Sequence, residues 1–146
     1  MISDRTTIPF QYARVAQVRI ARPTDRLEEV VAFYRDGLGL LELYRFTDHH
    51  GYDGVMLGLP RAAYHLEFTR HRAGSACPAP SADNLLVLYI PDPDELSGLQ
   101  ERLERMGYRA VDPHNPYWQG KSVTFEDPDR WRVVLCNDHG IASDQQ

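Results

Sequence analysis

Apolar and polar residues follow strand spacing and then helix spacing through the first half of the chain. Residues 14–20 alternate, which is typical of a strand with one buried face. A helix beginning at Thr24 or Asp25 is predicted next, because the apolar residues that follow recur at helical spacing. These residues are Leu27, Val30, Val31, Tyr34 and Leu38. Three further strands are predicted, at residues 40–46, 55–59 and 63–69.

The second half repeats this order after a segment rich in proline, serine and alanine. Residues 84–90 form a continuous apolar run typical of a buried strand, and Asp92 or Asp94 begins a second helix that ends at Gly107. The last strands are predicted at residues 108–111, 122–126 and 131–136. The repeat indicates an α+β fold built of two tandem βαβββ modules, with a general α+β sandwich as the alternative.

The pattern also predicts how the chain is divided. A single domain is expected over residues 14–137, with its modules at about 14–70 and 84–137 and a linker at 71–83. The polar segments 1–13 and 138–146 show no periodicity, and we expect both to be flexible.

Composition narrows the class of protein. A chain of 146 residues can bury a core without disulfide bonds, and its two cysteines are typical of a reducing cytoplasm. The net charge of -5 and the lack of a run of lysine and arginine argue against a nucleic-acid partner, because phosphate binding needs a positive surface. No apolar run reaches about 18 residues, and the first residues lack a secretory signal pattern. We therefore expect a cytoplasmic protein without a membrane partner.

The segment AFYRDGLGL at residues 32–40 resembles the first-helix signature of the vicinal oxygen chelate superfamily. That superfamily holds glyoxalase I, bleomycin- and fosfomycin-resistance proteins and ring-cleaving dioxygenases. In the second half, NPYW at 115–118, VTFEDPD at 123–129 and WRVVL at 131–135 resemble its closing segment. The most specific fit is to the YycE-like branch. The resemblance implies a glyoxalase/bleomycin-resistance/dioxygenase-type fold with a cavity, and often a homodimer whose cavities are shared between chains.

One residue departs from the pattern of the closing turn, which is written D-P-D-G in the superfamily. Arg130 stands where the glycine is usual. We therefore expect Arg130 to adopt a positive φ, at a cost of about 1 kcal/mol.

The resemblance also implies four metal-ligand positions, one on each of four strands. By motif they fall on Gln17, Glu67, Leu85 and Val134. Only Gln17 and Glu67 carry donor atoms, whereas a divalent metal needs three or more converging N or O donors. We therefore predict no metal cofactor. Bound nickel, zinc, manganese or iron is the alternative.

Strand alternation, applied to these positions, predicts which residues face the cavity. Arg19 shares a face with Gln17, and His65 shares one with Glu67, which gives a polar wall. Leu85, Arg132 and Val134 give a largely apolar wall, on which Tyr117 and Trp118 could stack a ligand. The predicted ligand-binding residues are Gln17, Arg19, His65, Glu67, Leu85, Tyr117, Trp118, Arg132 and Val134.

Simpler interpretations of the same residues stay open. His65 with Glu67 is a candidate pair for proton transfer, or both lie on a solvated sheet face. Tyr117 and Trp118 are ligand contacts, or else core or dimer aromatics. Arg19 and Arg132 are cavity residues that could also form an ion pair with Glu67.

The leading functional hypothesis is a metal-independent member of the superfamily that sequesters a small amphipathic organic molecule, as a homodimer of the resistance type. One alternative is a metal-dependent lyase, isomerase or dioxygenase of the glyoxalase type that uses Gln17 and Glu67. A second alternative is a non-catalytic module that only dimerises.

Overall fold

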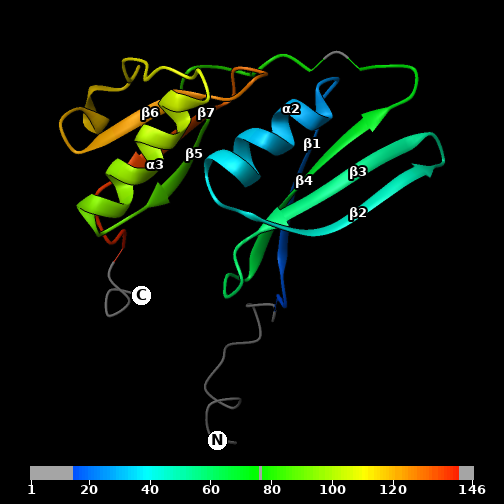
Figure 1. Cartoon of the computed structure of the whole chain (residues 1–146), viewed down its shortest axis with the longest axis horizontal. Coiled ribbons are helices and arrows are strands. Elements are labelled where there is room, and N and C mark those ends of the chain that lie inside the picture. The colour runs from blue at the N-terminus through cyan, green and yellow to red at the C-terminus, as the bar shows by residue number, and fades with distance from the viewer. Residues whose placement is uncertain (1–14, 76, 142–146) are drawn as a thin grey trace, which may run out of the picture.

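The computed structural model describes residues 15–75 and 77–141, and its strands form two separate sheets (Figure 1). The first half contains β1 (Val18–Pro23), α2 (Leu27–Val31), the π-helical turn η1 (Ala32–Gly37), β2 (Leu41–His49), β3 (Tyr52–Gly58) and β4 (Tyr64–His71). The second half contains β5 (Leu85–Tyr89), α3 (Pro93–Arg105), the 3-10 turn η2 (Pro116–Trp118), β6 (Ser122–Glu126) and β7 (Arg132–Cys136). The fold is therefore α+β, and each half supplies one sheet and one main helix, as the repeat predicted.

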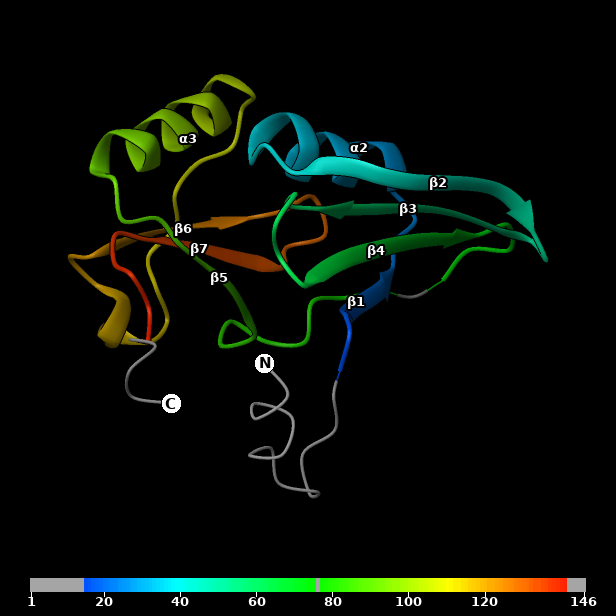
Figure 2. The same ribbon diagram turned by 90° about the horizontal axis from the view of Figure 1, so that it is seen from below.

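The two sheets have equivalent strand orders, β1-β4-β3-β2 and β5-β7-β6. In each sheet the first strand of the half lies at an edge and runs parallel to its last strand. Figure 2 shows α2 and α3 on the same side of the two sheets. Both sheets therefore have one side that faces the helices and one side that does not, called here the open side.

Two predicted strands differ from the structure. The strand expected at 14–20 lies at Val18–Pro23, because β4 offers pairing partners only from Tyr64, which pairs with Val18. The strand expected at 108–111 is reduced to one bridge between Val111 and Thr124, and Pro113 has no N–H to extend it. The expected flexible N-terminal segment lies outside the described residues, as do residues 142–146 of the C-terminal one.

The helix ends agree in part with the prediction. Asp92 is the N-cap of α3, where its carboxylate accepts a hydrogen bond from the backbone N–H of Asp94 at 2.8 Å. The first helix starts later than expected, at Leu27, with Arg26 as N-cap. The Thr24 hydroxyl accepts from the Arg26 N–H at 2.9 Å, so it stabilises the turn before the helix.

The core lies between the helices and the two sheets. Leu27, Val30 and Val31 of α2 are buried together with Val55 and Leu57 of β3. The two halves meet at Gly37, whose carbonyl accepts a hydrogen bond from Arg102 Nε at 2.8 Å. A Cβ at Gly37 would lie 2.6 Å from Leu103 Cδ2, so this close approach requires glycine.

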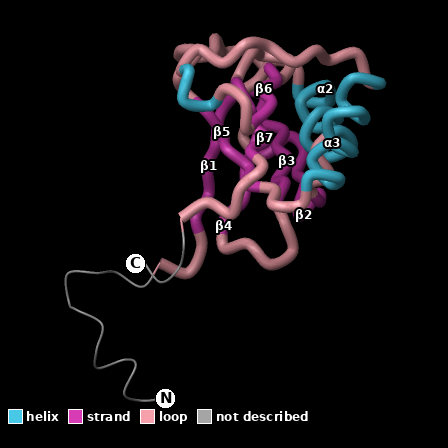
Figure 3. The backbone as a smooth tube through the Cα atoms, turned by 90° about the vertical axis from the view of Figure 1, so that its left-hand side faces the viewer, coloured by secondary structure: helices cyan, strands magenta, loops and turns pink. Residues whose placement is uncertain are grey.

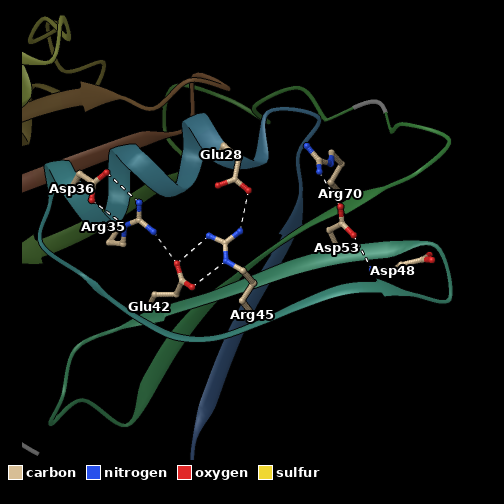
Figure 4. Close-up of polar contacts among 8 residues, drawn as sticks. All are labelled: Glu28, Arg35, Asp36, Glu42, Arg45, Asp48, Asp53 and Arg70. Carbon is tan, nitrogen blue, oxygen red and sulfur yellow. Dashed lines mark hydrogen bonds and ion pairs between the residues drawn. The ribbon is translucent and has the colours of Figure 1, made fainter.

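Strand β2 shows a charged helix-facing side. Arg45 binds Glu28 of α2 at 2.9 Å and Glu42 at 3.0 Å, and Arg35 of η1 binds Glu42 at 2.8 Å (Figure 4). Polar side chains thus take the place of a packed apolar face where the sheet extends beyond the helix. Among the described residues, no helix is long and apolar enough to cross a membrane.

Candidate functional site

A polar cluster lies on the open side of the first sheet, where Arg19 on β1 pairs in register with His65 on β4. Arg19 Nε donates a hydrogen bond to His65 Nε2 at 2.8 Å. Arg19 Nη1 lies 3.8 Å from Glu67 Oε1, two residues further along β4. The structure therefore places three of the predicted polar residues in contact on one face.

The contact with Arg19 decides the tautomer of His65. Because Nε2 accepts from a guanidinium, the neutral imidazole carries its proton on Nδ1. His65 is only 5% exposed, and its Nδ1 has no hydrogen-bond partner in the described part of the chain. An unpaired buried donor costs about 1–3 kcal/mol. His65 thus holds an unused N–H beneath the open side, and its other ring nitrogen is occupied.

Apolar side chains surround this cluster on the open side. Tyr44 pairs with Met56, and Met56 pairs with Glu67, so the three residues share a face. Leu43 lies against Gly58, because a Cβ at Gly58 would meet Leu43 Cδ1 at 2.8 Å. Leu43 is 48% exposed and Tyr44 is 60% exposed. The face is therefore amphipathic, with one guanidinium and one carboxylate beside accessible apolar groups.

The second sheet holds another group of the predicted residues. Leu85 on β5 pairs with Arg132 on β7, and both line a cavity of about 200 Å³ with Arg22, Tyr34 and Trp131. Arg132 Nε lies 3.2 Å from Glu126 Oε2, so Arg132 is paired there and not with Glu67. Of these two arginines, only Arg19 forms the expected ion pair with Glu67.

The remaining predicted residues differ in how accessible they are. Val134 is buried to 1% exposure, and Gln17 is exposed just before β1. Tyr117 is 63% exposed, and its ring lies 5.0 Å from that of Trp118 and 3.6 Å from Lys121 Nζ. Figure 3 shows η2, which carries both aromatic rings, on the side of the strands opposite α2 and α3. It therefore lies on the open side of the second sheet.

One chain thus presents the predicted site as two groups on two sheets. Arg19, His65 and Glu67 form the first group, and Leu85 and Arg132 belong to the second. Among the described residues, no hydrogen bond or ion pair joins the two groups.

Sequence reasoning missed a buried polar junction between the halves. Asp127, after β6, accepts hydrogen bonds from Tyr34 Oη at 2.8 Å and from the Trp131 N–H at 3.0 Å, and it is bound by Arg22. Arg22 also binds Asp129 at 2.9 Å. Burial, and next the charge of Asp127, raises the pKa of Tyr34 well above its usual value, so this hydroxyl stays a donor. Only the D-P-D motif marked this region in the sequence, and it indicated a turn.

The junction turn also confirms the expectation for Arg130, whose φ is 70°. Such a conformation costs a residue with a Cβ about 1 kcal/mol. The Arg130 N–H donates to the Asp127 carbonyl at 2.8 Å, which closes the turn.

The residues at the superfamily's metal positions do not fit a metal ion. Two of the four are aliphatic, and the Arg19 guanidinium lies beside Glu67, where its positive charge opposes a bound cation. Within residues 15–75 and 77–141, no three His, Cys, Asp or Glu side chains are grouped so that they could hold a metal.

Comparisons with known proteins agree with this fold. Residues 18–69 match the YycE-like N-terminal domain family, and residues 83–137 match the YycE-like C-terminal domain family. The uncharacterized protein YycE of Bacillus subtilis is 50% identical over 133 residues, which cover 91% of this chain and 96% of that protein. The crystal structure of a YycE protein of unknown function from Bacillus subtilis superposes with a TM-score of 0.86 at 49% identity, covering 93% of this chain and 99% of that one.

More distant solved structures share the fold alone. Glyoxalase I of Leishmania major gives a TM-score of 0.66 at 18% identity and covers 87% of this chain and 88% of its own. TnmS3, an antibiotic binding protein from Streptomyces, gives a TM-score of 0.61 at 22% identity and covers 86% of this chain and 98% of its own.

Proposed function

We propose that this chain, which belongs to the YycE-like family of the vicinal oxygen chelate superfamily, sequesters a small amphipathic organic molecule without a metal ion. The observation that carries the proposal is the position of Arg19, 3.8 Å from Glu67. A fixed guanidinium charge lies beside the one carboxylate among the superfamily's ligand positions. We place this activity in the cytoplasm, on the basis of the low cysteine content.

The open side of the first sheet supports this ligand class. The Arg19 side chain is 47% exposed, so its guanidinium is accessible to the polar end of a ligand. The accessible apolar groups of Leu43 and Tyr44 suit the remainder of such a molecule. TnmS3 is a precedent, because an antibiotic binding protein has this fold.

We further propose that the site is completed in a homodimer. The second wall predicted from the sequence lies on another sheet of the same chain, and no polar contact among the described residues joins it to Arg19. A second copy that lays the η2 side of its second module over the first sheet would bring Tyr117, Trp118 and Arg132 of one chain opposite Arg19 of the other. The same contact would bury Leu43 and Tyr44.

Metal analysis tests the first part of the proposal. Protein purified without an affinity tag is expected to contain far less than one equivalent of nickel, zinc, manganese or iron. Near-stoichiometric metal that is lost in Glu67→Ala would instead establish the alternative, a metal-dependent enzyme of the glyoxalase type.

Ligand screening tests the second part. A compound present at a hundredfold excess over its dissociation constant adds about 2.7 kcal/mol to stability and raises the melting temperature. Arg19→Gln should abolish that shift. Arg26→Gln is the matched control, because this arginine is 58% exposed and has only a 4.0 Å contact with Glu29. If no compound in a broad amphipathic library shifts the melting temperature, the chain is better described as a dimerising module.

A further inference from the structure

A second hollow lies on the helix side of the molecule, at the end of β5 opposite the 200 Å³ cavity. Its volume is about 630 Å³, within the range of small-molecule sites. We call it the α3 groove, and its lining includes Leu59, Tyr64, Leu88, Leu99, Arg102 and Arg105. None of Arg19, His65 and Glu67 lines it, so it is separate from the site proposed above.

Two arginines give the α3 groove an excess of positive charge. Arg102 Nε is held by the Gly37 carbonyl at 2.8 Å, which fixes the guanidinium at the groove. Within the described residues, neither Arg102 nor Arg105 forms an ion pair with a carboxylate. Glu95 is the only acidic residue of the lining, against these two cations. An anion placed there would meet charges that the chain itself leaves uncompensated.

The remainder of the groove is apolar and accessible. Leu59 is 39% exposed, and Leu88 and Leu99 in the lining are half-buried. Gly98 lies inside α3 on the groove wall, and a Cβ there would meet nothing within 4 Å. Glycine weakens a helix interior relative to alanine. Its lack of a side chain leaves this part of the groove open.

We propose that the α3 groove binds a second ligand, an amphipathic anion with an aliphatic tail. The anionic group of this ligand is a carboxylate, which Arg102 and Arg105 hold, and the aliphatic tail lies along Leu59, Leu88 and Leu99. This proposal does not depend on the function of the Arg19 site. It assigns the groove to a small molecule and not to a second copy of the chain.

Titration of the full-length, ¹⁵N-labelled protein with octanoate tests the proposal, with 1-octanol as the uncharged probe. Octanoate should shift the amide signals of Gly98 and Leu99 saturably, and 1-octanol should bind more weakly. Arg105→Gln should raise the dissociation constant for octanoate about tenfold and leave that for 1-octanol unchanged. Arg109→Gln removes the same charge from an exposed residue outside the groove and should change neither.

Gly98→Leu fills the groove with a side chain. In this variant the Leu99 amide signal should no longer shift with octanoate or with 1-octanol. The fold should be retained, because leucine favours a helix. Arg19→Gln should leave the Gly98 titration intact, which separates failure of this proposal from failure of the function proposed above. Equal affinity for octanoate and 1-octanol, or shifts confined to the Arg19 face, would overturn the assignment. Weaker self-association of Gly98→Leu would show that a second copy covers the groove.

Discussion

The two modules differ in how their open sides are covered. In the second module, Thr124, Val134 and Cys136 point to the open side, and each is at most 3% exposed. In the first module, Leu43 and Tyr44 point to the open side and are 48% and 60% exposed. Strands β6 and β7 of the second sheet are therefore covered within the chain, whereas the edge strand β2 of the first sheet is not.

Strand β2 makes the contrast sharper. Its helix-facing residues Glu42 and Arg45 are charged and paired, and its apolar residues are on the open side. An edge strand of a monomer would gain stability from the reverse arrangement, since apolar burial is the main favourable contribution to folding. The difference indicates that the first module is built to be covered from its open side, which is why we place the ligand and the second copy there.

The largest expected effect concerns the junction that joins both modules. Asp127→Ala removes one of the two carboxylate partners of Arg22 and takes the acceptor from the Tyr34 hydroxyl and from the Trp131 N–H. We expect the free energy of unfolding to fall by about 3 kcal/mol in urea titrations, because several donors at this junction lose their acceptor at once. Asp112→Ala, at an exposed side chain, is the control and should change stability by less than about 0.5 kcal/mol. A loss below about 1 kcal/mol for Asp127→Ala would show that the junction contributes little.

Truncation on the two open sides compares the modules directly. Val134→Ala should cost about 2 kcal/mol, because it leaves a cavity in a covered region. Tyr44→Ala, measured at a protein concentration low enough to keep the chain monomeric, should cost less than about 0.5 kcal/mol. Similar losses at both positions would mean that the first sheet is already covered within the monomer.

The dimer dissociation constant tests whether a second copy of the chain covers the open side of the first sheet. Tyr44→Glu places a charge in the proposed contact and should raise the dimer dissociation constant at least about tenfold in sedimentation velocity. Met106→Glu introduces the same charge at a residue that is 38% exposed at the end of α3, and it should have no effect. If wild-type protein sediments as a monomer at all concentrations, the shared site is wrong.

Much of this architecture follows from the sequence. Alternation and helical spacing predicted three of the four strands of the first sheet and the open-side face shared by Arg19, His65 and Glu67, and Asp92 was one of the two expected helix starts. Period-two spacing determines which residues share a face once strands are paired. The positive φ of Arg130 was predicted from the resemblance, because Arg130 stands where the superfamily's closing turn usually has glycine.

Long-range features were beyond the sequence. Nothing in the spacing of Arg22, Tyr34 and Asp127 predicts that they meet, because Asp127 is about a hundred positions away from both of its partners. The strand expected at 108–111 has a suitable local pattern, but it lacks a partner that pairs along its length. The first strand was expected to bury one face, but no residue of β1 is buried, because burial depends on tertiary packing that residue spacing does not determine.

The smallest expected effect is on the charged side of β2. Hydrogen bonds from Arg45, and then from Arg35, lower the pKa of Glu42 below its usual 4.5 (Figure 4). A carboxyl whose pKa is lower in the folded state stabilises the fold above its unfolded pKa, and this contribution is lost as pH falls through the folded value. Glu42→Gln should therefore cost about 0.5 kcal/mol at pH 7, since the pairs are accessible to solvent, and the gap should close below pH 4.5. Glu101→Gln, at an exposed position of α3, should show no such pH-dependent gap, and a Glu42→Gln gap that persists at acid pH would trace the effect to packing instead of charge.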